Sequence, residues 1–369
     1  MMLKEELEIL RGEPIEVFTG DPMDIPCIET SDPEKLCKHP VVSVQMITYN
    51  HEPYIRQAIE GVMMQKTDFE FELIIGEDCS RDRTREICFE YQKRHPDKIR
   101  VLWWHENVSK HGGNGRRCRA RCRGEFIALC EGDDYWTDPY KLQKQVDLLR
   151  KHATATFCFC GSKVLEQETG EVIVWNSNGN RQSRLIRGKE FFDHHLFGGR
   201  GCGGFGFLMT ATVMFRREAT RRLEAEYEVF SWRMHLGDTT LWLGLSSLGD
   251  VYYLADDVSV YRRHGGGVCH KQPMGVLIDA LIVRIYWARK IESTRSLVVK
   301  FHELYDDRFY CMLESRDIRC AARKLLLAQR VFSQLVDERK NWVVKLLVFP
   351  FVPCALVKWM VLCKRRLFG

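Results

Sequence analysis

The sequence predicts an α/β fold in which helices flank a mainly parallel sheet, followed by a helical C-terminal region. Three observations predict the α/β class. Short apolar runs of strand length alternate with segments of helical periodicity from residue 41 onward. Polar and acidic residues gather where the strand runs end. From about Pro273 the pattern becomes helical and stays so.

The elements follow one another in strand and helix order. The run VVSVQMIT, from Val41, has the length and composition of a buried strand. Apolar residues then recur at helical spacing over 54–63, and the strand-like FELIIG completes one βαβ unit. Later segments repeat the pattern: a helix over 83–95, strands over 99–104, 125–130 and 155–160, the run 207–215, a helix over 238–249 and a strand over 251–255.

The sequence pattern divides the chain into three predicted parts. Residues 1–38 are acidic and rich in proline, which predicts an extension laid on or trailing from the domain. Residues 39–268 form the predicted α/β domain, and residues 269–369 form the predicted helical region. The apolar stretch Leu346–Val357 is broken by two prolines and is shorter than the about 20 residues of a spanning helix. A membrane-surface contact over 342–366 and a helix packed on the domain both fit it.

Charge and cysteine content restrict the class of protein. A formal net charge of +5 on 369 residues is too small to predict a nucleic-acid partner unless the basic residues share one face. The cluster Arg116–Arg123 fits a solvated helix face, and it also fits an anionic acceptor site or a lipid contact. No C-x-x-C pair occurs among the 15 cysteines. The charged N-terminus lacks the apolar core of a signal peptide, so we expect a cytoplasmic protein, with the inner face of the membrane as an alternative.

The acidic group Glu131-Gly132-Asp133-Asp134 is the strongest chemical signal. Three carboxylates at the end of one strand repel each other unless a cation compensates them. Mg²⁺ and Mn²⁺ prefer oxygen ligands and commonly combine one or two carboxylates with substrate phosphates. The group therefore predicts a divalent-metal site, against the alternative of an acidic turn that caps the following helix.

Several segments, taken in order, resemble the successive motifs of family 2 glycosyltransferases with the GT-A fold. They are TYNHEPYIRQAI, IIGEDCSRDRT, GEFIALCEGDDYWTDPYKLQKQV, the pair Gly237-Asp238 and YRRHGGG, which together cover about residues 40–267. The resemblance implies an inverting, metal-dependent transfer of a sugar from a nucleoside diphosphate sugar to an acceptor hydroxyl. A glycan or a lipid-linked acceptor, in surface polysaccharide or glycan synthesis, is the expected context.

The resemblance also assigns roles to residues. Asp238 is the expected catalytic base, and Asp134, Asp133 and His264 are the expected ligands of Mn²⁺ or Mg²⁺. Glu131 stands where many relatives have the first Asp of the motif. The expected nucleotide-binding residues are Thr48, Tyr49, Asn50, Asp78 and Asp133. Further contacts to diphosphate or acceptor are expected from Arg262, Arg263 and Trp136.

Alternatives stay open for the single residues and for the function. Asp78 also fits a turn cap, Asp238 a helix N-cap and His264 a structural role. A sugar nucleotidyltransferase uses a related sheet with metal and carboxylates, but it carries a Gly-rich, basic loop after the first strand, which TYNHEPY is not. A non-catalytic nucleotide-sugar binder would keep Asp78 and lose the base.

Overall fold

The computed structural model describes residues 27–108, 113–175, 182–197, 208–232 and 237–267, with isolated positions nearer both ends. The chain divides into two compact units. One comprises Ile15–Trp287, and the other joins Met1–Pro14 to Ala288–Gly369. The following description concerns the first unit. The predicted membrane-surface segment 342–366 lies outside the described residues.

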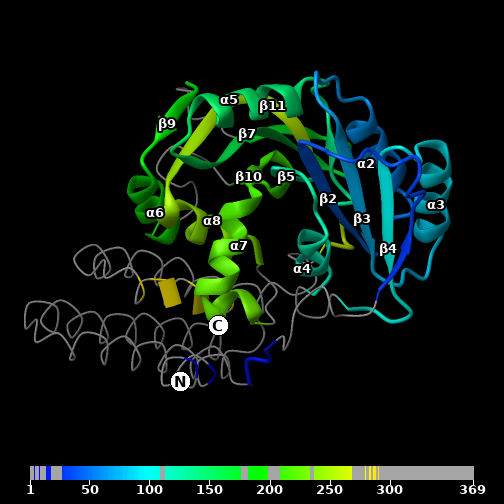
Figure 1. The fold of residues 1–369 in the computed structure, drawn as a ribbon, viewed down its shortest axis with the longest axis horizontal. Coiled ribbons are helices and arrows are strands. Elements are labelled where there is room, and N and C mark those ends of the chain that lie inside the picture. The colour runs from blue at the N-terminus through cyan, green and yellow to red at the C-terminus, as the bar shows by residue number, and fades with distance from the viewer. Residues whose placement is uncertain are drawn as a thin grey trace, which may run out of the picture. The chain divides into compact units, whose positions relative to one another are not determined.

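Four parallel strands form the first half of the sheet, in the order β4-β3-β2-β5 (Figure 1). Their bounds are β2 Val42–Thr48, β3 Phe71–Glu77, β4 Ile99–Trp103 and β5 Phe126–Leu129. The connecting helices are α2 Ile55–Met63, α3 Thr84–Arg94 and α4 Gly113–Ala120. These elements confirm the strands and helices predicted for residues 41–130. Since parallel strands all run the same way, their carboxyl ends share one edge of the sheet.

The second half of the sheet is mixed, which differs from the mainly parallel sheet predicted. Its strands are β6 Tyr135–Trp136, β7 Ala155–Glu166, β8 Val172–Trp175, β9 Arg184–Ile186, β10 Met214–Arg216 and β11 Asp250–Arg263. β10 lies antiparallel between β5 and β7, whereas β7 and β11 pair in parallel. The apolar run 207–215 is not one strand, because a 3-10 turn at Thr210–Thr212 interrupts it before β10 begins.

The remaining helices cover the second half of the sheet. They are α5 Lys141–Lys151, α6 Gly188–Phe197, α7 Arg217–Glu226 and α8 Gly237–Leu248. α8 is apolar nearly all round, which fits its position between the sheet and α6 and α7. No helix in the described part of the chain is both long and apolar enough to cross a membrane.

An edge strand, β1 Ile28–Thr30, pairs antiparallel with β4. It lies within the segment predicted as an extension, and its Glu29 accepts hydrogen bonds from Arg100. Arg100 also reaches the fully buried Glu72, which receives a further bond from Arg123. Arg119 pairs with Glu224 of α7 at 2.7 Å. Part of the Arg116–Arg123 cluster therefore binds acidic groups of the domain itself instead of forming only a solvated face.

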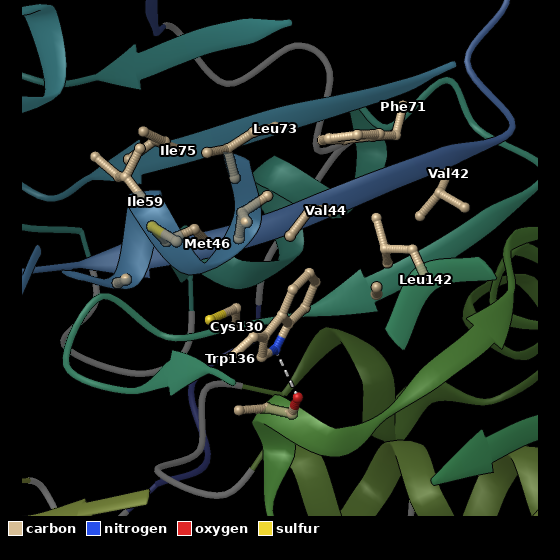
Figure 2. Close-up of a cluster of buried hydrophobic side chains, with 14 of the residues drawn as sticks. Val42, Val44, Met46, Ile59, Phe71, Leu73, Ile75, Cys130, Trp136 and Leu142 are labelled. Atoms are coloured by element: carbon tan, nitrogen blue, oxygen red, sulfur yellow. Dashed lines mark hydrogen bonds between the residues drawn. The ribbon is translucent and has the colours of Figure 1, made fainter. Parts of the chain in front are cut away.

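Trp136 belongs to the main hydrophobic core, where it packs among side chains of β2, β3 and α2 (Figure 2). Its indole N–H donates to the carbonyl of Ala211 at 2.8 Å, so the buried polar atom is satisfied. The side chain is 2% exposed. The structure thus places Trp136 inside the core and not at a diphosphate or acceptor surface.

Candidate active site

The pairing of β11 with β6 builds the centre of the site. Ser259 lies opposite Trp136 and Val260 opposite Tyr135, so the end of β11 runs back along the residues that precede β6. The backbone N–H of Arg262 donates to Oδ1 of Asp134 at 2.9 Å. Two residues further on, Nε2 of His264 lies 3.1 Å from Oδ2 of Asp133. The EGDD turn and the YRRH segment, both selected from the sequence, therefore meet.

Asp133 lies between two imidazoles. His51 Nε2 is 3.5 Å from the same Oδ2 atom that contacts His264. Burial raises the pKa of the Asp133 carboxyl, but the nearby imidazoles of His51 and His264 lower it further, so the net pKa lies below its usual value. Asp133 is therefore an ionised carboxylate, as a metal or phosphate-associated site requires.

Asp134 is more deeply buried than Asp133. It is 3% exposed and its carboxylate accepts the Arg262 N–H. Burial, with the charges of Asp133 and Glu131, raises the pKa of Asp134 well above its usual value. This contact joins the EGDD turn to β11, which is a structural role for a residue predicted to be the direct metal ligand.

Glu131 is a buried carboxyl whose Oε2 atom has no hydrogen-bond partner. Burial, followed by the charge of Asp133, raises its pKa from 4.5 to about 8, and the charge of Asp238 adds to the shift. α8 thus brings Asp238 near enough to the acidic turn for the two carboxyls to influence each other. Asp238 stands in the first turn of α8, and its Oδ1 accepts the N–H of Thr239 at 2.6 Å.

Apart from Asp133, the predicted nucleotide-binding residues lie at the carboxyl ends of β2 and β3. Thr48 is buried and its hydroxyl oxygen has no hydrogen-bond partner. Asp78 is fully buried, and its Oδ1 accepts the N–H of Val108 at 2.7 Å. Tyr49 follows Thr48 directly after β2.

Asn50 joins the two strand-end loops. It has the left-handed φ of 56° that Asn tolerates well. Its Oδ1 accepts from Arg81 N at 2.8 Å, and its own N–H donates to Ser80 Oγ at 2.9 Å.

Arg262 and Arg263 point to separate protein partners. The Arg262 guanidinium lies over the rings of Tyr54 and Tyr135 and donates to Gln57 and Gln167. The residue is 7% exposed, and both of these hydrogen bonds lie inside the protein. Arg263 pairs with Glu166 at 2.7 Å. The sequence predicted diphosphate or acceptor contacts for both residues. In the structure the two guanidinium groups contact protein side chains, and alternation along β11 turns these adjacent residues to opposite faces.

Two residues of the site were absent from the predictions, His51 and Tyr54. The ring of Tyr54 lies 4.7 Å from that of His264, measured between centroids. Both residues lie in TYNHEPY, directly after a strand that the sequence identified correctly. Their position at a strand end was a usable signal, but nothing in the local sequence indicates a contact with residues 133 and 264.

The donor set fits a divalent ion in part. Within the described ranges, no group of three His, Cys, Asp and Glu side chains is arranged to hold a metal. Asp133 Oδ2 and His264 Nε2, at 3.1 Å, have about the spacing of adjacent ligands on an octahedral ion with bonds of roughly 2.1 Å. A pair of protein ligands suits Mg²⁺ or Mn²⁺ that keeps water and substrate phosphate as its other ligands.

The fold is of the GT-A type found in glycosyltransferases. Residues 43–223 match the family model described as "Glycosyl transferase family 2". Residues 43–223 therefore form a glycosyl transferase family 2 domain.

Curated relatives include an uncharacterised protein of Mycobacterium tuberculosis, 32% identical over 62% of this chain and 60% of its own length. The match to this relative thus covers less than two thirds of its length. EpsE of Bacillus subtilis, named as a candidate glycosyltransferase, is 27% identical over 61% of this chain and 76% of its own. TuaG of the same organism, named as a candidate teichuronic acid biosynthesis glycosyltransferase, is 32% identical over 35% of this chain and 49% of its own.

Solved structures share the fold at low sequence identity. Staphylococcus aureus TarS is 18% identical to this chain, with a TM-score of 0.51. The match covers 74% of this chain and 44% of the TarS chain. The mannosyltransferase PcManGT of Pyrobaculum calidifontis, in complex with GDP-Man and Mn²⁺, is 15% identical. The match covers 97% of this chain and 93% of the PcManGT chain, with a TM-score of 0.52.

Proposed function

We propose that this protein transfers a sugar from a nucleoside diphosphate sugar to an acceptor hydroxyl, with inversion at the anomeric carbon. One observation carries the proposal: Asp133 of the acidic turn lies 3.1 Å from His264, and the charge of Asp238 acts on Glu131 of the same turn. A donor-holding pair and a separate carboxylate are the two elements that a single displacement needs.

Asp133 and His264 are the residues that would hold a divalent ion, Mn²⁺ or Mg²⁺. When bound, such an ion acts as a Lewis acid that stabilises negative charge on a leaving diphosphate. Asp134 was the expected direct ligand, but its carboxylate accepts the Arg262 N–H. We therefore assign Asp134 to holding the turn and Asp133 to the ion.

Asp238 is the proposed general base. Its carboxylate is in the first turn of α8, and its charge raises the pKa of Glu131 in the acidic turn. It would take the proton from the acceptor hydroxyl as that oxygen attacks the anomeric carbon from the face opposite the diphosphate. Its Oδ1 accepts the Thr239 N–H, which restrains the orientation of the carboxylate.

The nucleoside is assigned to the carboxyl ends of β2 and β3. Asp78 accepts from Val108 through Oδ1, and a carboxylate can accept further bonds from a ring N–H. Thr48 has a buried hydroxyl with unused hydrogen-bonding capacity. Asn50 shapes this end of the site through its bonds to Ser80 and Arg81, and Tyr49 lies beside it.

The names of related proteins support the substrate class and context. TarS has been solved with UDP-GlcNAc, at 17% identity and a TM-score of 0.50, and PcManGT with GDP-Man. A relative in Shigella flexneri is named a dTDP-rhamnosyl transferase. Since TuaG is named for teichuronic acid biosynthesis, we propose a glycan or lipid-linked acceptor in surface polysaccharide synthesis, at the cytoplasmic face of the membrane.

A donor screen tests the proposal. The purified chain is mixed with UDP-, GDP- and dTDP-sugars, with and without Mn²⁺, and both the melting temperature and the release of nucleoside diphosphate are measured. At least one sugar nucleotide should raise the melting temperature, since a ligand that binds only the folded state stabilises it, and Mn²⁺ should increase both effects. Asp133→Asn should abolish the Mn²⁺ effect, with Asp256→Asn, a surface carboxylate paired with Lys144, as the matched control. Turnover by Asp133→Asn at the wild-type rate would contradict the role of Asp133.

A further inference from the structure

The short turn between β2 and α2 contacts both members of the Asp133–His264 pair. His51 Nε2 lies 3.5 Å from Asp133 Oδ2. Three residues later, the ring of Tyr54 lies 4.7 Å from that of His264, at an interplanar angle of 55°. A single turn of six residues after β2 therefore contacts residues from the EGDD turn and from the end of β11.

The backbone of His51 is held on both sides. Its N–H donates to Thr84 Oγ1 at 2.9 Å, and its carbonyl accepts from the N–H groups of Tyr54 and Ile55, both at 2.8 Å. The next residue, Glu52, donates its N–H to Asp82 at 3.1 Å. These bonds fix the turn to the start of α3 and of α2, so the His51 imidazole is presented from a rigid support.

The space around the His51 ring is also closely filled. A Cβ atom added at Gly132 would come within 3.0 Å of His51 Nδ1 and 2.6 Å of Thr48 Oγ1. The side chain of His51 is 16% exposed and that of Asp133 is 21% exposed. Gly132 thus lets the imidazole lie directly against the EGDD turn, where few other orientations are available to it.

Tyr54 is fixed from its other side. The Arg262 guanidinium lies 5.2 Å from the centre of the Tyr54 ring and reaches Gln57 on α2. The ring therefore has Arg262 and His264 as neighbours, both from the end of β11. Its contact restricts the orientation of the His264 imidazole, whose side chain is only 8% exposed.

We infer that His51 and Tyr54 are positioning residues, which preset Asp133 and His264 as a pair before a divalent ion and a nucleoside diphosphate bind. The inference rests on the proposed metal role of that pair. His51 restrains the Asp133 carboxylate through Oδ2, and Tyr54 restrains the His264 ring. Outer partners of this kind orient metal ligands, and their removal commonly weakens metal binding 10- to 100-fold. Neither residue is required to touch the ion.

Mn²⁺ binding tests the inference without relying on turnover. Electron paramagnetic resonance measures free Mn²⁺ in titrations of the full chain, in the presence of UDP and, separately, of GDP. His51→Ala should raise the dissociation constant for Mn²⁺ about 10- to 100-fold. His51→Gln, which can place an N–H near the position of Nε2, should recover much of the loss.

Tyr54 is tested by the same titration. Tyr54→Phe keeps the ring and should bind Mn²⁺ like the wild type, whereas Tyr54→Leu should bind it more weakly. His39→Ala, at an exposed position in the loop before β2, is the matched control, and circular dichroism checks that each variant is folded.

Two results would overturn the inference in distinguishable ways. If His51→Ala and Tyr54→Leu bind Mn²⁺ within twofold of the wild type while Asp133→Asn does not bind it, the metal role stands and the positioning role fails. If the wild type binds no Mn²⁺ with either nucleotide, the metal role and the inference fail together.

Discussion

Nε2 of His264 lies 3.1 Å from Oδ2 of Asp133, although 131 positions separate the two residues in the sequence. The antiparallel pairing of β11 with β6 produces this contact, since β6 begins directly after the EGDD turn and β11 ends directly before His264. A short strand of two residues therefore sets the geometry of the proposed donor site. The same pairing allows the Arg262 N–H to reach Asp134.

Replacing Asp238 with Asn should remove the proposed base while keeping a side chain of the same size. We expect kcat to fall about a hundredfold to ten-thousandfold, the usual contribution of general acid–base catalysis. The dissociation constant of the nucleoside diphosphate should change little. Initial-rate kinetics and calorimetric titration measure the two quantities, and an unchanged kcat would remove Asp238 from the mechanism.

The pH dependence of stability should report the buried carboxyl of Glu131. Its pKa is raised from 4.5 to about 8, chiefly by burial, so between these values the folded protein holds a proton that the unfolded chain releases. This contribution is fully present below about pH 4.5 and is lost as the pH rises to about 8, by at most about 1.4 kcal/mol per pH unit. The pKa of the Asp133 carboxyl is lowered from 3.8, so this group changes its protonation below the pH range in which Glu131 does.

The melting temperature of the metal-free protein should therefore fall between pH 5 and pH 8. Glu131→Gln cannot ionise and should flatten the slope relative to the wild type. Differential scanning calorimetry in chelator-treated buffers makes the comparison. Parallel curves for the two proteins would show that Glu131 does not titrate in this range.

Gly132→Ala should destabilise the site through crowding. The added methyl carbon would lie 2.6 Å from Thr48 Oγ1 and 2.7 Å from Thr48 Cβ, closer than atoms can pack without moving. Overpacking of this kind costs about 1–3 kcal/mol. At Gly265 an added Cβ meets no atom of the described residues within 4 Å, so Gly265→Ala is the control. Urea denaturation measures both, and equal stability of the two variants would contradict the close approach.

Alanine substitutions of the adjacent residues Arg262 and Arg263 should lower the free energy of unfolding by very different amounts. Arg262→Ala removes a buried guanidinium with two aromatic rings and two glutamine oxygens around it, and should cost about 2–3 kcal/mol of unfolding free energy. Arg263→Ala breaks a partly exposed pair with Glu166 and should change stability by about 0.5 kcal/mol or less. If Arg262 bound diphosphate instead, Arg262→Ala would lower affinity for nucleotide and leave the unfolding free energy unchanged.

Much of the first half of the fold was predictable because its elements carry strong local periodicity. β2, β3, β4 and β5 are short apolar runs, and α2 and α3 have apolar faces of helical spacing, so residue type alone indicates them. The second half was less predictable. β10 has three residues and β6 has two, and strands so short exist only because neighbouring strands pair with them.

The order of motifs along the sequence, by itself, determined the family and the acidic turn at the end of β5, and it predicted Asp238 and His264 as members of a site. These are properties of residue identity and local pattern. Only the tertiary structure decided that Asp133, rather than Asp134, faces His264, that His51 and Tyr54 join the pair, and that Trp136 and Arg262 lie inside the protein. The physical reason is that adjacent residues in extended segments point to opposite sides, and only the register of β11 on β6 determines which side faces which partner.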